Sequence, residues 1–444
     1  MRLPQHLQAP AALREIASDL LDSRLGIVPR VFQIDREAGS PDFFHFYASA
    51  CDTQGFSAEP NFSTSGGASR HRDVALAKAL GEAVERYCSA IYDPARMPVV
   101  SYERAPFRCV EPERFALYTP EQYDLDGFPF ERFDRTTPVR WFPALDVVTR
   151  ETVHVPAAMV FVPYHYDFDH GEPQIAQPIS TGLACHSSYE SACISAACEA
   201  IERDAFTTTW QAMLEPTRIR AESLGSLNAD LIERFTKARY DVTLFDITTD
   251  IAIPAILSVA RHQAESEPAF VVAAAAHPDA QTAVRKCLEE LEHTRTWCKT
   301  LKRRVAPVPR DGADEISSQV DHLRFWCDQR NAELGSFLFR STGECDLDSL
   351  PSVRSADPGT QFIAVAQAIR RANLQFLVTD LTTTDVYDLG LRVVRAIVPG
   401  LHPLVVGHRL RALGGRRLFG ALERFGYTSS SPGRPLNTAP HPFP

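Results

Sequence analysis

Two short stretches of the chain share a pattern of two glutamates followed by an arginine. "LGEAVERY" spans residues 80–87, and "ACEAIERD" spans residues 197–204. In each stretch the glutamates stand three residues apart and the arginine follows directly, so the three side chains share one face of a helix. We predict that these two faces carry the chemistry of the protein. They comprise Glu82, Glu85 and Arg86 in the first stretch and Glu199, Glu202 and Arg203 in the second.

A single face of this kind is usually a solvated set of ion pairs. Here the surrounding residues are mostly Ala, Leu, Ile and Cys, which indicates helices that are otherwise buried. A buried carboxylate needs a compensating cation. Four carboxylates without a histidine or cysteine ligand favour a hard ion, and Mg²⁺ in particular is held by carboxylates together with nucleotide phosphates. The two arginines would then bind those phosphates.

The elements that must position these faces are helices and strands in alternation. Apolar spacing predicts a helix over residues 73–92, with Asp73 as its N-cap and the flexible loop "SGGAS" (residues 65–69) before it. A second helix is predicted over residues 189–210, after the turn "STGLACH", and a third over residues 280–297. Apolar, β-branched runs predict strands within residues 240–261 and 269–278, and two more on either side of a short turn or helix within 374–403. The predicted fold class is therefore α/β or α+β.

Composition narrows the class of protein. The chain has 444 residues, 44% of them hydrophobic, and a net charge of -10. The sequence has no apolar run of the roughly 18 residues that a membrane span needs, and the N-terminus does not read as an export signal. The ten cysteines form no CxxC motif, which is typical of reduced, cytoplasmic thiols. We therefore expect a cytoplasmic protein with neither a membrane nor a nucleic acid as its partner.

Other sites were weighed against the two glutamate faces. "YHYDFDH" (residues 164–170) could hold a metal, but a polar loop is the more common meaning of such a stretch. The basic stretch "GHRLRALGGRR" (residues 407–417) is interpreted as a solvated helix end and turn. The sequence has no Walker phosphate loop and no nucleophile elbow, although a Cys or Ser nucleophile with a His base stays open.

One turn before Glu199, Ser195 extends the second face to the pattern SxxxExxER. This pattern, together with the earlier "ALGEAVER" helix, resembles the YcaO family of ATP-dependent enzymes that activate peptide backbone amides. "STGLACH", "LFDITTDIAIPAI", "LEELEHTR" and "VVRAIVPGLHPL" resemble further motifs of that family, in the same order along the chain. The resemblance implies a YcaO fold, with mixed sheets and packed helices that carry the two ExxER motifs.

The family resemblance also implies roles for individual residues and the cofactors ATP and Mg²⁺. Three positions depart from common family patterns: Gly66-Gly67-Ala68 replaces a loop with a lysine, and Thr181 and His293 replace an asparagine and a glutamine. The implied metal ligands are Glu82, Glu85, Glu199 and Glu202, and the implied ATP-binding residues are Ser69, Arg86, Ser195, Arg203 and Arg295.

The chain ends in "NTAPHPFP", with a proline at every second position. Such a segment cannot continue a helix and stays extended, which lowers the entropy lost when it is placed in a groove. Relatives that form azolines typically end in PxPxP, so the resemblance implies a cyclodehydratase that converts Cys, Ser or Thr of a ribosomally made precursor peptide into thiazoline or oxazoline, as in microcin B17-like antibiotic biosynthesis. Pro440, Pro442 and Pro444 would belong to its active site, and the terminal carboxylate of Pro444 would transfer a proton.

The same resemblance implies partners and a division of the chain. We expect a precursor peptide with a leader, a leader-binding protein that resembles ubiquitin-activating enzymes, and an FMN-dependent azoline dehydrogenase, all in a hetero-oligomeric complex. Residues 1–60 are expected to be an N-terminal segment, 61–427 the catalytic domain, and 428–444 an extended tail. The alternatives are a YcaO enzyme that makes a thioamide or amidine, a non-catalytic scaffold that binds peptide or nucleotide, and an unrelated Mg²⁺ enzyme with convergent glutamate faces.

Overall fold

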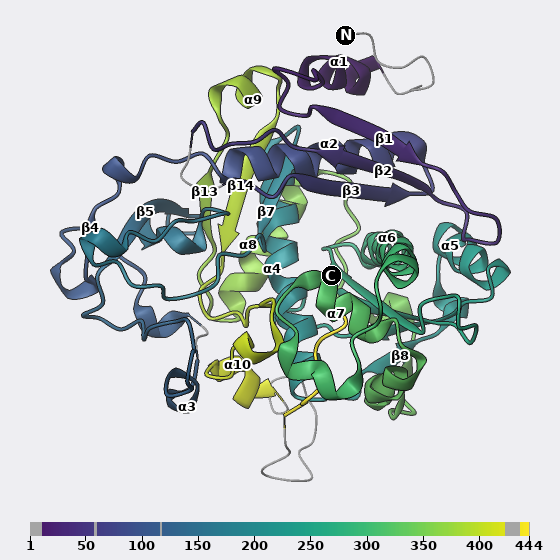
Figure 1. Ribbon diagram of the computed structural model, residues 1–444. Coiled ribbons are helices and arrows are strands. Elements are labelled where there is room, and N and C mark those ends of the chain that lie inside the picture. Colours follow the sequence, from purple (N-terminus) through teal and green to yellow (C-terminus); the bar gives the residue numbers. More distant parts are fainter. Residues whose placement is uncertain (1–10, 57–59, 116–117, 422–435, 444) are drawn as a thin grey trace. The chain divides into compact units, whose positions relative to one another are not determined.

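The computed structural model describes residues 11–56, 60–115, 118–421 and 436–443, and it contains both helices and strands (Figure 1). The predicted mixed α/β class is therefore confirmed. Contacts divide the chain into two units. The first contains residues 1–35, 44–200 and 358–400, and the second contains residues 36–43, 201–357 and 401–444. The division predicted near residues 60 and 427 stays a prediction.

The first unit contains two sheets. One is antiparallel, with the order β1-β2-β3, and α2 packs against it (Figure 1). The other has the order β4-β5-β13-β14-β7, with β6 paired to β5. The elements are α1 (Ala11–Leu20), β1 (Arg30–Ile34), β2 (Phe44–Ser49), β3 (Thr64–Ser69), α2 (Arg72–Ser89), β4 (Val99–Val100), α3 (Pro120–Tyr123), β5 (Val139–Asp146), β6 (Thr152–Pro156), β7 (Leu183–His186), α8 (Pro358–Arg371), β13 (Leu377–Asp380), α9 (Thr384–Asp388) and β14 (Arg392–Ile397).

The second unit is built on a mixed sheet with the order β11-β10-β9-β8-β12, in which only the β8-β12 pair is parallel. Helix α6 packs against β10 and β11. The elements of the second unit are β8 (Thr217–Ile219), α5 (Ser226–Lys237), β9 (Asp241–Asp246), β10 (Ala255–Arg261), β11 (Phe270–Ala276), α6 (Ala280–Arg304), α7 (Gln319–Trp326), β12 (Glu344–Cys345) and α10 (Arg416–Phe419). Helix α4 (Tyr189–Gln211) begins in the first unit and ends in the second.

Each predicted helix and strand has a counterpart in the structure, but the start of the first helix differs from the prediction. The stretch expected to be a flexible loop is strand β3, and the N-cap of α2 is His71 rather than Asp73. Helix α2 packs so closely on β3 that a Cβ atom on Gly67 would lie 2.4 Å from the carbonyl oxygen of Ala75. The glycines therefore serve close packing between strand and helix rather than flexibility.

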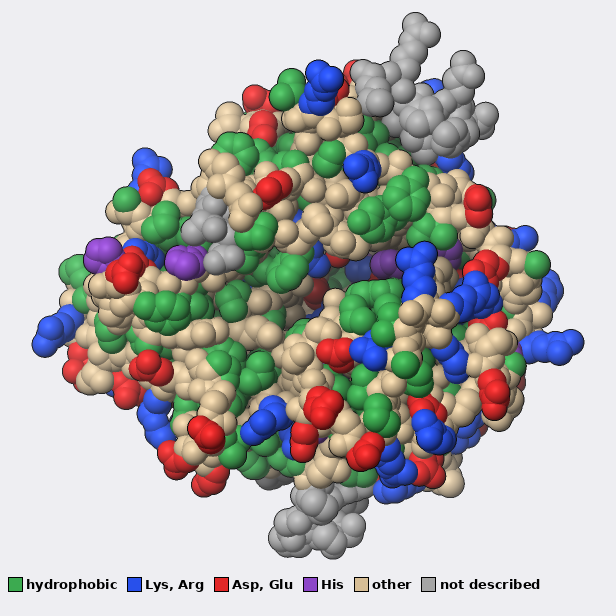
Figure 2. Space-filling model, in the orientation of Figure 1, with side chains coloured by type: hydrophobic (Ala, Val, Ile, Leu, Met, Phe, Trp, Pro, Cys, Tyr) green, Lys and Arg blue, Asp and Glu red, His purple; other side chains and the backbone are tan. Residues whose placement is uncertain are grey.

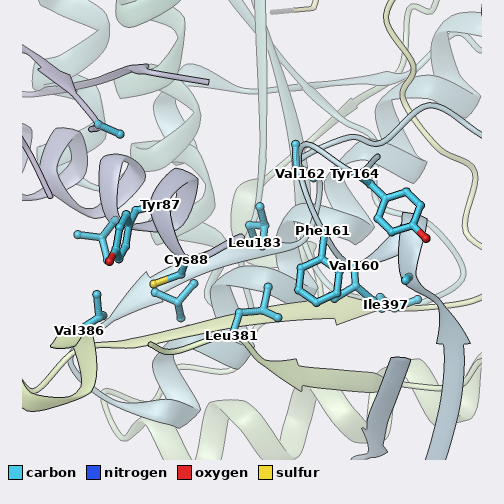
Figure 3. Packing of buried hydrophobic residues seen from close by; sticks show 14 of the residues in the cluster. Tyr87, Cys88, Val160, Phe161, Val162, Tyr164, Leu183, Leu381, Val386 and Ile397 are labelled. Carbon is cyan, nitrogen blue, oxygen red and sulfur yellow. The ribbon is translucent and has the colours of Figure 1, made fainter. Parts of the chain in front are cut away.

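The core of the first unit surrounds the end of α2. Tyr87 and Cys88 of α2 belong to the same buried cluster as Leu183 of β7 and Ile397 of β14 (Figure 3). This packing fixes the helix that carries the first glutamate face. On the face shown in Figure 2, basic and acidic side chains are interspersed. Among the described residues, no helix is long and apolar enough to cross a membrane.

Candidate active site

The first glutamate face is tied to strand β3. Glu82 of α2 accepts a hydrogen bond from the backbone N–H of Gly66 (2.8 Å) through one carboxylate oxygen. Its other oxygen accepts a bond from Arg86, one turn further along the helix (3.0 Å). The close approach of strand and helix at Gly67 therefore places a backbone donor on the carboxylate.

Glu85 lies one turn further along the same face and accepts the backbone N–H of Cys185 in β7 (2.7 Å). Burial, reinforced by the carboxylates of Glu82 and Glu199, raises the pKa of Glu85 to about 8. The structure thus brings three of the four predicted metal ligands within electrostatic range of one another in the first unit.

Glu199 is held by the turn that precedes β7. Its carboxylate accepts the backbone N–H of Gly182 (3.2 Å). Gly182 has a φ of +86°, and a Cβ atom there would lie 2.4 Å from the carbonyl oxygen of Ala396, so the turn requires glycine. Each of the three glutamates therefore accepts a backbone N–H that fixes its carboxylate.

Along α4 the predicted stripe is the accessible one. Between residues 192 and 203, the only residues that are not fully buried are Ser195, Glu199, Glu202 and Arg203. In the second unit, the Arg203 guanidinium is paired with Glu202. The spacing on which the prediction rested therefore corresponds to the face that solvent or a ligand can reach.

Arg395 of β14 is a functional candidate that the sequence analysis did not identify. It is 4% exposed, one of its Nη atoms donates to the carbonyl of Ile179 (2.8 Å), and its Nε and other Nη have no partner among the described residues. Burial lowers its pKa to about 10, while the Glu199 carboxylate opposes that shift and Arg86 adds to it. An arginine alone in the apolar run "VVRAIV" was the signal that could have revealed it.

Glu290 of α6 is a second acidic candidate for the site that the sequence motifs do not indicate. Burial raises the pKa of the Cys287 thiol, and Glu202 and Glu290 both add to this shift. Both carboxylates therefore lie within electrostatic range of one thiol in the second unit. Glu290 also pairs with His293, 3.5 Å away.

These groups suit a metal and a polyphosphate. The buried carboxyl group of Glu85, whose pKa is raised, would gain from a divalent cation. Buried guanidinium N–H groups that lack acceptors among the described residues suit phosphate oxygens. Arg86, like Arg395, has a buried Nε without a partner among the described residues. Within those residues, no three His, Cys, Asp or Glu side chains converge as a ready-made metal site. A metal bound by the carboxylates would therefore take its remaining ligands from water or phosphate.

Other predicted site residues have structural partners. The Ser69 hydroxyl accepts the backbone N–H of His71 (3.2 Å) at the start of α2. Arg295 is 2% exposed and forms two hydrogen bonds of 2.7 Å with Glu292 of its own helix. The nucleotide contacts predicted for Ser69 and Arg295 stay predictions.

The alternative metal cluster at residues 164–170 is held together by internal bonds. Asp167 accepts hydrogen bonds from Arg140 (2.5 Å) and from His170 (2.8 Å). Asp167 also caps the short 3₁₀ turn that follows it. This stretch is therefore a structural loop, as the common interpretation predicts.

The basic stretch near the C-terminus is predicted to be a solvated helix end, but one of its arginines is buried. Arg417 is 2% exposed and forms ion pairs with Asp204 of α4 (2.8 Å) and with Asp250, which follows β9 (2.7 Å). Arg416 beside it is exposed. The solvated interpretation is therefore wrong for Arg417, which anchors α10 to α4.

The C-terminal segment is extended and buried in the second unit. Pro440 and Pro442 are both buried, and Pro444 lies outside the described residues. The His441 ring stacks on the ring of His322 of α7, with centroids 3.8 Å apart. His322 donates from Nδ1 to the carbonyl of His441 (2.9 Å) and accepts the backbone N–H of Gly407 at Nε2 (3.1 Å). One ring nitrogen of His322 thus donates and the other accepts, which is the hydrogen-bonding pattern of a neutral imidazole.

The buried histidine pair predicts acid sensitivity. Burial lowers the pKa of His322 to about 4 from 6.5, and burial, reinforced by His322 and Arg203, lowers the pKa of His441 well below its usual value. Below pH 6.5 the unfolded state binds a proton on His322 that the folded state excludes. The folded state therefore has its full stability above pH 6.5 and loses stability as pH falls toward 4. The other charged groups that act on the pair are His408, which lowers the pKa of His322, and Arg203.

We expect the free energy of unfolding to fall by about 2–3 kcal/mol between pH 7 and pH 4 because of His322 alone. Glutamine keeps a donor and an acceptor but does not titrate, so His322→Gln should reduce this loss. Denaturant unfolding at several pH values measures the loss of stability in the unmodified protein and in the variant. Equal pH slopes for the two proteins would contradict the assignment.

In this mixed α/β protein, acidic and basic side chains of α2, α4 and β14 lie close to backbone donors. This arrangement is typical of enzymes that bind a metal and a nucleotide. The family model described as "YcaO cyclodehydratase, ATP- and Mg²⁺-binding" matches residues 66–402. The chain therefore belongs to the YcaO family of ATP-dependent cyclodehydratases.

The chain is also similar to individual known proteins. An uncharacterised protein of Methanothermobacter thermautotrophicus is 28% identical over 77% of this chain and 83% of its own length. A heterocyclase solved in complex with substrate and cofactor has a TM-score of 0.80 and 20% identity, over 100% of this chain and 58% of its own. YcaO from Methanopyrus kandleri, bound with AMPPCP and Mg²⁺, has a TM-score of 0.64 and 19% identity, over 95% of both chains. The chain thus has the fold of both structures and spans little more than half the length of the heterocyclase.

Proposed function

We propose that this protein converts Cys, Ser or Thr residues of a ribosomally made precursor peptide into thiazoline or oxazoline rings, in the biosynthesis of an azole-containing peptide antibiotic. The observation that carries the proposal is the C-terminal segment: Pro440 and Pro442 are buried, and Phe443 lies against Arg203 of the second ExxER motif. Relatives that form azolines typically end in PxPxP, whereas relatives that make thioamides or amidines often lack this ending, so the segment supports ring formation.

The proposed reaction begins when the side-chain thiol or hydroxyl attacks the preceding backbone carbonyl. The oxygen of that carbonyl then takes the terminal phosphoryl group of ATP, with ADP as the leaving group. The ring C=N bond forms as phosphate departs with that oxygen. For each ring, the peptide therefore loses the elements of one water, and one ATP becomes ADP and phosphate. Phosphorylation is needed because an amide-derived oxygen is by itself a poor leaving group.

The chain's own residues would supply binding and charge. Glu82, Glu85, Glu199 and Glu202 would hold Mg²⁺, which when bound neutralises charge on the transferring phosphoryl group. Arg86 and Arg203 would orient the phosphates. Arg395 is a further candidate for this role, because its buried Nε and one Nη have no partner within the described part of the chain. Backbone donors already hold three of the four carboxylates, so little reorganisation is needed at the moment of reaction.

We propose that the substrate arrives with a partner. The chain spans 58% of the length of the heterocyclase that it resembles. A separate leader-binding protein resembling ubiquitin-activating enzymes would supply recognition of the precursor. An FMN-dependent dehydrogenase would oxidise the azolines to azoles in the same complex, in the cytoplasm.

Ring formation is tested by incubating this protein with a candidate precursor, the leader-binding partner, ATP and Mg²⁺. We expect the peptide to lose one water per ring, with stoichiometric release of phosphate. Exchange of oxygen for sulfur or nitrogen in the peptide would instead indicate a thioamide or amidine. Absence of phosphate release would indicate a scaffold.

The terminal carboxylate of Pro444 is proposed to transfer a proton during ring formation. One glycine added after Pro444 moves that carboxylate, and we expect kcat to fall by about 100-fold, the usual contribution of a positioned acid or base. The control inserts one glycine beside Gly39, in an exposed turn with a positive φ. Full turnover after the extension would refute the role of the carboxylate.

A further inference from the structure

Phe443, the last described residue, lies under the arginine of the second ExxER motif. Its side chain is 1% exposed, and the guanidinium carbon of Arg203 stands 4.4 Å from the centre of its ring. This is well within the distance at which a cation gains from the negative face of an aromatic ring. The ring also contacts Phe206 of α4, with centroids 4.5 Å apart.

The backbone just before Phe443 is held by a row of side-chain donors. The indole N–H of Trp210 donates to the carbonyl of Ala439 (3.2 Å), and that of Trp326 donates to Pro440 (3.1 Å). The next carbonyl, that of His441, accepts the bond from His322. Three successive carbonyls of a proline-rich segment thus each accept a side-chain hydrogen bond, which is how aromatic grooves recognise polyproline segments.

The row of donors fixes where the ring of Phe443 can lie. Proline restricts the backbone on both sides of His441 and Phe443, and each carbonyl in the row is anchored. The segment begins on α4 as well, because Asn437 donates its backbone N–H to Gln211 (2.8 Å) and its side-chain amide to Trp210 (3.1 Å). The C-terminal segment therefore presents the ring to α4 as a fixed surface.

Arg203 forms both an ion pair and a cation–π contact. Its guanidinium contacts the Glu202 carboxylate on its own helix and the face of the Phe443 ring. A long, flexible arginine next to a carboxylate can settle onto it in several rotamers. A buried aromatic face restricts the guanidinium to one plane without neutralising its charge, which favours one fixed orientation toward an anion.

We propose that Phe443 is a positioning residue for Arg203: the C-terminal segment of the chain holds the motif arginine in the orientation that binds nucleotide phosphate. This inference rests on the proposed function and adds to it a role for the PHPFP segment in nucleotide binding, separate from any proton transfer by Pro444. The segment would then affect ATP affinity as well as ring formation.

The test weakens the ring's charge distribution without changing its size. Phenylalanine with one, two and then five fluorines replaces Phe443 in the full-length protein, and the affinity for Mg²⁺-AMPPCP is measured by calorimetry. We expect the Kd to rise with each step, by about 3- to 30-fold at five fluorines, as loss of a partly desolvated cation–π contact implies. Phe443→Leu should raise the Kd at least as much.

The matched control is Phe245→Leu, which removes a fully buried ring from β9 in the same unit. It should lower the melting temperature but leave the Kd unchanged. If Phe443→Leu weakens binding while the fluorinated series does not, the ring acts only by packing and the inference is overturned. If the unmodified protein fails to bind Mg²⁺-AMPPCP, the proposed function fails and this inference fails with it.

Discussion

Glu199→Gln is expected to abolish ATP turnover while leaving the protein folded. Glu199 lies on the accessible stripe of α4, accepts the N–H of Gly182 and acts on the pKa of Glu85. Glutamine keeps the shape and can still accept that bond, but it removes one negative charge from the proposed metal site. We expect phosphate release to fall by about 100-fold or more, the scale seen when metal sites lose supporting interactions. Glu202→Gln should behave in the same way.

The control for both variants is Glu233→Gln on α5. Glu233 pairs with Lys237 one turn away (2.8 Å), and both side chains are exposed. This change should alter neither turnover nor melting temperature, because exposed pairs contribute little. The melting temperature of metal-free Glu199→Gln should equal or exceed that of the unmodified protein, since the change removes repulsion near Glu85. An unaffected rate of phosphate release would contradict the metal assignment.

Arg417→Met should lower the free energy of unfolding by about 3–5 kcal/mol, the cost of leaving a buried charge without its partner. Asp204 is fully buried and accepts hydrogen bonds of 2.8 to 3.0 Å from Arg417. Asp204 also accepts a hydrogen bond from the backbone N–H of His402 (2.7 Å). With Arg417 removed, the carboxylate must stay charged without a cation or take up a proton. Denaturant unfolding at pH 7 measures the loss.

Two variants separate this effect from a general loss of α10. Arg416→Met changes the exposed neighbour and should cost less than about 0.5 kcal/mol. Adding Asp204→Asn to Arg417→Met should restore part of the stability, because the buried charge is then gone. A double variant as unstable as the sum of the single ones would show that the two residues do not interact.

The periodic features of the sequence predicted the most. The i, i+3, i+4 spacing of Ser195, Glu199, Glu202 and Arg203 corresponds to the accessible stripe of an otherwise buried helix segment, since helical periodicity alone decides which residues share a face. The apolar, β-branched runs correspond to β9, β10, β11, β13 and β14, because such side chains pack well on the surface of a buried sheet. Resemblance to the family, rather than periodicity, linked the two helices to one chemistry.

Features that depend on distant partners could not be predicted. The residues that donate to the glutamates are backbone groups of Gly66, Gly182 and Cys185, whose positions follow from sheet pairing and not from residue type. The basic stretch around Arg417 predicts a solvated side chain because the acidic partners of Arg417 are distant in sequence, the nearer being Asp250. The glycines of β3 predict a loop because glycine is common in loops, whereas here glycine allows close packing on α2.

The central claim is that the peptide amide oxygen is phosphorylated and leaves with the phosphate. The most direct measurement uses a precursor whose backbone carbonyls before Cys, Ser or Thr carry heavy oxygen, with this protein, its partner, ATP and Mg²⁺ in ordinary water. We predict one heavy oxygen atom in each phosphate released during ring formation. Phosphate free of the label, released while rings form, would show that ATP hydrolysis is separate from the peptide and would contradict the proposed reaction.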